Sequence, residues 1–178
     1  MGLGFGNTKL VHLNRKPPMY ILTMLFLVLA LSLNAGVVLA QKRHSPSADG
    51  LEITDSRTGL IWRRCVEGMV WKAPTCSGPA YFSSQSEAVA RAKNAATEGQ
   101  VWRLPTMKEL SAIVAVREAE QGKAAIDPAA FPATPVARCW TSSSVGPGYF
   151  MYVGFADGGA GEGPRNSPGA VRLVRDPK

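Results

Sequence analysis

Hydrophobic and polar residues alternate in several short runs of the chain, as they do in strands with one buried face. The runs cover residues 51–54, 60–62, 139–141, 149–155 and 171–175. In the last run, Val171 and Leu173 are predicted to point inward and Arg172 and Arg175 outward. Turn-forming residues such as those at 55–59 separate the runs, which predicts antiparallel hairpins.

Two other segments carry the signals of helices. Ser84 and Glu87 form a capping box before an alanine-rich run, and Thr106 and Glu109 form a second capping box. The first helix is predicted to bury only small residues against a sheet, namely Ala88, Ala92, Ala95 and Ala96. The second helix is predicted to begin at Thr106 and to fade before Gly122.

The junction before the second helix is the most strongly specified part of the sequence. Trp102 and Leu104 are predicted to be buried on either side of Arg103, and Pro105 disfavours the helical conformation for the residue before it. Arg103 is expected to pair with a carboxylate. Three tryptophans lie in strand-like patterns and are predicted to be core residues: Trp62, Trp102 and Trp140.

Together, these elements predict an α+β fold class, with two helices beside a mostly antiparallel sheet. Residues 156–170 hold five glycines and two prolines. This composition predicts a flexible segment.

Residues 1–40 are predicted to be a targeting segment. Basic residues (Lys9, Arg15, Lys16) precede an apolar run, and Val38–Ala40 offers small residues for cleavage before Gln41. The alternative is an uncleaved N-terminal membrane anchor, because 22 mostly apolar residues from Met19 to Ala40 are enough to span a bilayer. Residues 41–50 are predicted to be a flexible leader, and residues 51–176 the folded domain.

Without residues 1–40, 138 residues remain, with a net charge of +4 (17 − 13). That size is typical of one domain. The mild positive charge could favour binding to an acidic polysaccharide or an anionic surface, but solubility alone explains it equally well. The dense lysine and arginine clusters of a nucleic-acid-binding protein do not occur, so nucleic acid is not a predicted partner.

Cysteine spacing predicts one disulfide. Cys65 and Cys76 flank a segment with glycine and proline, which indicates a loop or hairpin closed by a disulfide and stabilised by roughly 3 kcal/mol. Such a bond indicates an oxidising compartment. The spacing does not fit a metal site. Cys139 is predicted to be a buried free thiol, and its pairing with Cys65 or Cys76 stays open.

One combination of motifs carries a resemblance to a known family. It comprises Thr58–Trp62, Cys65, Cys76, Trp102–Pro105, Glu109–Leu110, Phe131–Pro132, Trp140–Ser144 and Val171–Arg175. In this order, over about residues 51–176, the chain resembles the bacterial domain family typified by the C-terminal domain of the Legionella collagen-like (Lcl) adhesin.

The resemblance implies a C-type-lectin-like fold whose N- and C-terminal strands pair. It also implies a secreted or surface-exposed protein, since some members are adhesins that bind sulfated polysaccharides. The chain departs from its relatives after Phe155–Gly158, where a glycine-rich segment replaces a strand rich in aromatic residues. The aromatic face on which a sugar could stack is therefore missing at that place.

No enzyme is predicted. The hydroxyl run 141–144 has no histidine base, because His12 lies in the targeting segment and His44 in the leader. No metal site or cofactor is predicted either. The predicted ligand-binding residues are Tyr149, Tyr152, Arg165 and Asn166, for which ordinary solvated loop residues are the alternative.

The leading hypothesis is an exported bacterial binding or adhesion-type domain, non-catalytic, which recognises an acidic polysaccharide or an envelope protein. The alternative is a structural or assembly subunit of a periplasmic or surface complex, in which residues 156–170 would become ordered on contact with a partner. Contact with a membrane is expected only through an uncleaved N-terminal segment. The predicted location is the periplasm, the cell surface or the medium.

Overall fold

The structure, a computed structural model, describes residues 1–2, 42–96 and 99–177. The predicted signal peptide or membrane anchor therefore lies outside the described residues, apart from Met1 and Gly2. The folded unit falls within Gln41–Lys178. Among the described residues, none of the helices has the length and apolar character needed to cross a membrane.

One sheet contains four strands in the order β1 (His44–Pro46), β2 (Glu52–Asp55), β3 (Ile61–Arg63) and β11 (Val174–Arg175). All its neighbouring strands are antiparallel. Strands β2 and β3 confirm the first predicted hairpin. The C-terminal strand joins the sheet of the N-terminal strands by pairing with β3, so both ends of the domain lie in one sheet.

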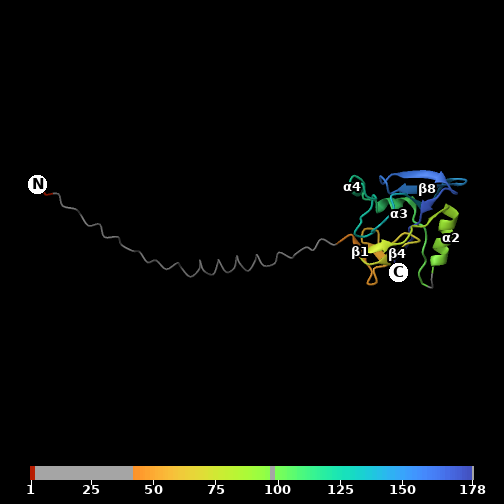
Figure 1. The fold of residues 1–178 in the computed structure, drawn as a ribbon, viewed down its shortest axis with the longest axis horizontal. Coiled ribbons are helices and arrows are strands. Elements are labelled where there is room, and N and C mark those ends of the chain that lie inside the picture. The colour runs from red at the N-terminus through yellow and green to blue at the C-terminus, as the bar shows by residue number, and fades with distance from the viewer. Residues whose placement is uncertain (3–41, 97–98, 178) are drawn as a thin grey trace, which may run out of the picture. The chain divides into compact units, whose positions relative to one another are not determined.

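A second sheet has five strands, in the order β6 (Phe82–Ser83), β10 (Gly169–Ala170), β7 (Arg138–Gly146), β8 (Tyr149–Gly154) and β9 (Ala160–Pro164). Among the described strands, β10 and β7 form the one parallel pair. In Figure 1 strand β8 lies at the top of the domain, with α3 beneath it. The predicted α+β architecture is confirmed.

Strand β9 corrects the prediction of a flexible segment at 156–170. It pairs with β8 from Tyr149 opposite Pro164 to Val153 opposite Ala160. Packing requires a glycine at position 161, because a Cβ there would lie 2.7 Å from the phenol ring of Tyr152. The glycines therefore let a large side chain of β8 lie across β9.

The predicted disulfide is confirmed. Cys65 and Cys76 are bonded with their Cα atoms 5.7 Å apart. The bond ties the hairpin of β4 (Val70–Lys72) and β5 (Thr75–Ser77) to the segment that follows β3. Cys139 is free and buried, as expected. Burial raises the pKa of its thiol to about 11, so it stays protonated at neutral pH.

Three short helices are described: α2 (Gln85–Ala95), α3 (Met107–Ala112) and α4 (Val116–Ala119). Both predicted capping boxes are present. The second predicted helix is divided between α3 and α4. The division has a tertiary cause, because Val114 forms an isolated bridge with Ile126 and the Ala115 N–H donates to the Ala125 carbonyl.

The junction before α3 is formed as predicted. Trp102 and Leu104 are both 3% exposed, and Arg103 between them donates to Glu109 at 2.9 Å and to Asp176 at 2.9 Å. These hydrogen bonds raise the pKa of Arg103. Glu109 has a lowered pKa although burial alone would raise it, because its hydrogen bonds from Arg103 and the Thr106 N–H outweigh the burial.

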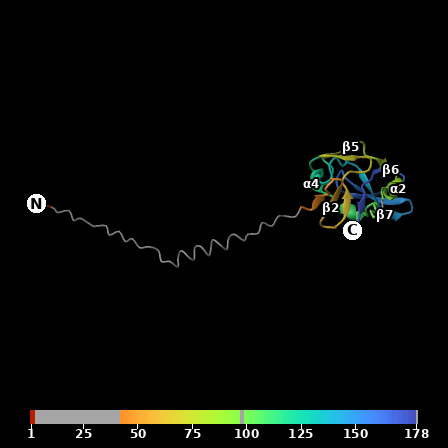
Figure 2. The ribbon, with the colours of Figure 1, turned by 90° about the horizontal axis from the view of Figure 1, so that it is seen from below.

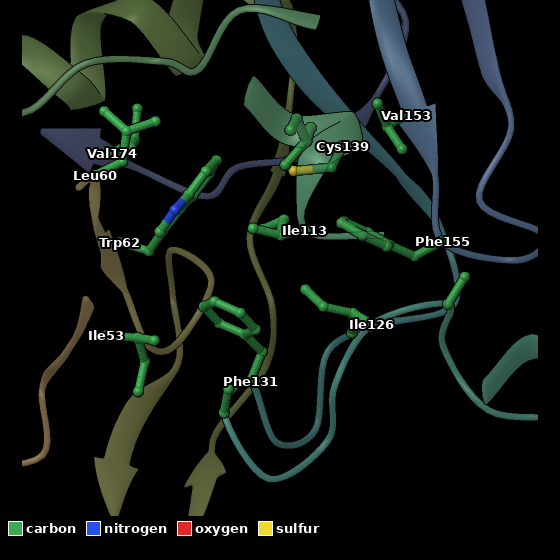
Figure 3. Close-up of a cluster of buried hydrophobic side chains, with 13 residues drawn as sticks. Ile53, Leu60, Trp62, Ile113, Ile126, Phe131, Cys139, Val153, Phe155 and Val174 are labelled. Carbon is green, nitrogen blue, oxygen red and sulfur yellow. The ribbon is translucent and has the colours of Figure 1, made fainter. Parts of the chain in front are cut away.

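Two hydrophobic clusters form the core. The larger joins the two sheets, with Trp62 of β3, Val153 of β8 and Ile113 after α3 among its members, and Figure 3 shows these side chains converging. The smaller cluster packs α2 against the five-stranded sheet through Ala88, Ala92 and Trp140, among others. The three tryptophans predicted to be core residues are buried, and α2 lies beside β6 and β7 in Figure 2.

The predicted outward orientation of Arg172 and Arg175 is wrong. Arg172 is 0% exposed and Arg175 8% exposed. Residues 171–173 run from β10 of one sheet to β11 of the other, and the carbonyls of Val171 and Leu173 accept from the N–H groups of Glu67 and Arg63. Because the segment is covered on both sides, the alternation of a half-buried strand does not apply.

The predicted flexible leader at 41–50 also needs correction, because residues 44–46 form strand β1. Two polar contacts dock it. Arg43 pairs with the fully buried Asp55 at 2.8 Å, and His44 Nδ1 lies 3.1 Å from Asp127 Oδ2 with its ring against Phe131. Asp127 lies 83 residues from His44 along the chain, so no local pattern predicts its contact with β1.

Candidate functional site

The half-buried guanidinium of Arg63 in β3 is the centre of the most site-like region. Trp62 of β3 points into the core, so the next residue, Arg63, points to the other face of the sheet. There its Cζ lies 4.7 Å from the centroid of the Trp102 ring. Its backbone is fixed as well, because the Arg63 N–H donates to Leu173 and its carbonyl accepts from Arg172.

Within the part of the chain that the structure describes, Arg63 is a cation without an acidic partner. Arg175 lies near the same tryptophan ring, 5.4 Å from its centroid, but its charge is matched by Glu52 at 2.6 Å. Arg63 forms no salt bridge with any residue that the structure describes. Within the same residues its buried Nε has no hydrogen-bond partner.

Helix α2 supplies a second arginine close by. Arg91 Cζ lies 3.5 Å from the centroid of the Tyr81 ring, and its Nη1 is 3.9 Å from Glu67 Oε2. The Tyr81 N–H donates to the Glu67 carbonyl at 2.8 Å. Arg91, Asn94 and Ala95 share one helix face because they lie three and four residues apart.

Two cavities adjoin at Arg63 and Glu67, which line both, and we call them together the Arg63 groove. The larger has a volume of about 550 Å³ and lies between Arg63 and the α2 face that carries Arg91 and Asn94. The smaller, of about 230 Å³, lies against the disulfide-bonded hairpin at Trp71. The larger volume is in the range of small-ligand sites.

The hairpin wall of the groove is held in place by a third stacked arginine. Arg64 Cζ lies 3.7 Å from the centroid of the Trp71 ring, and its guanidinium donates to the carbonyls of Gly50 and Ala129. Burial lowers the pKa of Arg64. Trp71 also packs directly on Gly50, where an added Cβ would lie 2.5 Å from the indole nitrogen.

The arginine side chains of the groove offer positive charge and hydrogen-bond donors. Planar guanidinium groups bind carboxylate, sulfate or phosphate through paired hydrogen bonds. In the described part of the chain, no three histidine, cysteine or acidic side chains are grouped as metal ligands would be.

The four residues predicted to contact a ligand do not form one surface. Tyr149 begins β8 and is 47% exposed, whereas Tyr152 is half-buried and packs edge-on against Trp140. Three positions apart in one strand, they face opposite sides of the sheet. Arg165 and Asn166 are both exposed and lie in the turn after β9.

The side chain of Arg165 contacts helix α2. Its Nη2 donates to the Ser86 hydroxyl of α2 at 2.9 Å and its Nε donates to the same atom at 3.2 Å. Its backbone carbonyl accepts from Gln85 N–H at 2.8 Å. It therefore joins the turn after β9 to the start of α2.

Sequence reasoning missed the residues of the Arg63 groove. One signal was present, because side chains alternate along a strand and Arg63 must therefore lie on the face opposite Trp62. Nothing in the sequence brings Arg63 to Arg91 on α2 or to Trp71 in the hairpin. Those neighbours depend on how β3, the hairpin and α2 are packed.

Comparison with known proteins gives one finding on the family. The model of the Lcl C-terminal domain matches residues 52–175. Neither the curated proteins nor the solved structures include a significant match. The disulfide between Cys65 and Cys76 indicates an extracytoplasmic location. Because the family model covers residues 52–175, this chain belongs to the Lcl C-terminal domain family.

Proposed function

We propose that this protein is an exported, non-catalytic binding domain of C-type-lectin-like fold that recognises an acidic polysaccharide. The observation that carries the proposal is the Arg63 groove, where one guanidinium has no acidic partner among the described residues and further arginines stack on aromatic rings. Membership of a family typified by an adhesin supports a binding role. The mostly antiparallel sheets, with β11 beside the N-terminal hairpin, are compatible with the proposed lectin-like fold.

A non-catalytic role is supported by the hydroxyl groups at 141–144, which are used in structural hydrogen bonds. Thr141 Oγ1 donates to the Met151 carbonyl at 2.7 Å, and Ser142 Oγ donates to the Pro105 carbonyl at 3.3 Å. Ser143 Oγ accepts from the Met107 N–H at 3.0 Å. These oxygens connect β7 to β8 and to the start of α3.

Binding to an acidic polysaccharide is tested with the full chain purified in mild detergent and a series of immobilised polysaccharides. We expect saturable binding to acidic chains at about 50 mM salt, and at least tenfold weaker binding at about 300 mM, because salt screens exposed charges. Uncharged polysaccharides are the control. Equal binding to charged and uncharged chains at low salt, or no binding to either, would contradict the proposal.

The alternative function, a subunit of a periplasmic or surface complex, is no longer supported by residues 156–170. It relied on residues 156–170 becoming ordered on contact, but β9 already orders Ala160–Pro164 within the domain. A pull-down from envelope extracts separates the two functions. A stoichiometric protein partner, together with the absence of polysaccharide binding, would favour the alternative.

Export is proposed to end with cleavage before Gln41, which leaves β1 close to the new N-terminus. Mass spectrometry of the protein isolated from the envelope and from the medium tests this step. We expect a chain that begins at Gln41. A chain that retains the preceding residues would instead support the N-terminal anchor.

A further inference from the structure

We infer that the Arg63 groove binds a saccharide chain that carries isolated carboxylates, such as a uronic-acid oligosaccharide, and that it disfavours a densely sulfated chain. This inference rests on the proposed binding of acidic polysaccharides and specifies its site and ligand class.

The cationic part of the site is Arg63. Its guanidinium lies over the Trp102 ring and has no carboxylate partner within the described residues. Its side chain lines both cavities, so an anion bound there would lie at the centre of the groove. A guanidinium in this position matches one carboxylate through two parallel hydrogen bonds.

The acidic residues of the groove set a limit on the charge of the ligand. The larger cavity is lined by two arginines, Arg63 and Arg91, and by two glutamates, Glu67 and Glu87. Arg91 is already close to Glu67, at 3.9 Å. A chain with several sulfates on each sugar would bring anions within a Debye length of both glutamates, where like charges repel.

Neutral parts of a sugar fit the remaining lining. Glu67 accepts hydrogen bonds from hydroxyl groups, and Asn94 of α2 both donates and accepts them. In the smaller cavity Met69, Val70 and Trp71 offer apolar surface for the C–H faces of a sugar ring. Alternation of one carboxylate with several hydroxyls therefore matches the groove better than uniform negative charge.

The test is calorimetric titration of the full chain in mild detergent with three oligosaccharides of equal length: an oligogalacturonate, a neutral glucose oligomer and a heparin-derived sulfated oligomer. We expect the oligogalacturonate to bind at least about tenfold more tightly than the neutral oligomer, the size of a charge-assisted hydrogen bond. We also expect it to bind more tightly than the sulfated oligomer.

Substitutions in the Arg63 groove test whether the oligosaccharide binds there. Arg63→Gln is expected to weaken oligogalacturonate binding at least about tenfold, and Asn94→Ala by roughly threefold to tenfold. Glu67→Gln should reduce the preference over the sulfated oligomer, because it removes a like charge. Lys93→Gln is the matched control, since it removes one positive charge from α2 outside the groove, and it should leave the affinity unchanged.

Circular dichroism melting separates lost binding from lost structure. If Arg63→Gln does not fold, Asn94→Ala on the exposed face of α2 and Glu67→Gln still decide the question. Tighter binding of the sulfated oligomer, or comparable binding of an oligoglutamate peptide, would overturn the ligand class. Oligogalacturonate binding that Arg63→Gln and Asn94→Ala leave intact would overturn the site alone. Absence of binding to every acidic polysaccharide would overturn the proposed function as well.

Discussion

Replacing Arg172 with methionine is expected to lower the free energy of unfolding by about 4 kcal/mol, because several buried acceptors lose their donor at once. Arg172 Nη1 donates to the Arg63 carbonyl at 2.9 Å and to the Arg64 carbonyl at 2.6 Å. It also donates to Thr134 Oγ1 at 2.7 Å, and that hydroxyl donates to the Phe131 carbonyl at 2.8 Å. One side chain therefore joins β3 to the loop that carries Phe131.

A competing effect works in the opposite direction. Burial lowers the pKa of Arg172 to about 10, which shows that the charged form is disfavoured by desolvation, although it remains charged at neutral pH. Methionine removes that penalty and keeps the contact with the Phe131 ring, whose centroid lies 4.7 Å from the guanidinium carbon. The unmatched acceptors outweigh the gain, because each costs about 1–3 kcal/mol.

Thermal and urea unfolding measure the effect, with an expected fall in Tm of roughly 10–20 °C. Arg172→Lys should recover only part of the loss, because an ammonium group cannot reproduce the planar fork of a guanidinium. Arg117→Met, at an exposed position of α4, is the matched control and should change stability by no more than about 0.5 kcal/mol. A methionine variant as stable as the native protein would show that Arg172 carries no structural role.

The second large effect is expected for Asp55→Ala, which should cost about 3–5 kcal/mol at neutral pH because it leaves a paired cation without its partner. Asp55 is fully buried. It accepts from Arg43 Nε at 3.0 Å, from Arg43 Nη2 at 2.8 Å and from the Arg57 N–H at 3.0 Å. Since Arg43 also donates to the Ala112 carbonyl, the substitution should loosen β1 from both β2 and α3.

The loss should depend on pH in a defined direction. Burial alone would raise the pKa of Asp55, but the hydrogen bonds from Arg43 and the Arg57 N–H and the charge of Arg43 hold it below the ordinary value of 3.8. With a depressed pKa in the folded state, the unfolded chain binds more protons below that value. The stabilisation is therefore complete above it and is lost as the pH falls through the folded-state pKa.

Urea unfolding at pH 7 and at about pH 2 tests this dependence. The difference in stability between the native protein and Asp55→Ala should be large at pH 7 and much smaller in acid. Glu120→Ala, which removes an exposed carboxylate at the end of α4, should have little effect at either pH. An equal loss at both pH values would show that the ion pair is not the cause.

Local signals predicted the helix starts and the strand ends well. Both capping boxes need only side chains that are three residues apart, and Pro105 acts on the residue directly before it. The disulfide between Cys65 and Cys76 was predictable for the same reason, since the two cysteines are only 11 positions apart in the sequence. Such features follow from sequence because the groups that interact are close along the chain.

Predictions failed where a segment contacts elements that are distant in sequence. The outward orientation of Arg172 assumed one solvent-facing side, but residues 171–173 cross between the two sheets and are covered on both. The flexible leader failed because Asp55 and Asp127 hold Arg43 and His44. In each case the folded domain buries a polar residue together with its hydrogen-bonding partners. The spacing of hydrophobic residues in the sequence does not show which partners these are.

Local patterns in the chain were enough to predict the α+β architecture, the tryptophan core, the capped helices, the disulfide and the family. They also indicated that Arg63 and Trp62 lie on opposite faces of β3. Only the tertiary structure decided that Arg63 lies on Trp102 without an acidic partner among the described residues, and that Arg91 and Trp71 line the same groove. The physical reason is that secondary structure depends on neighbours in the chain, whereas a binding site depends on side chains that packing brings together.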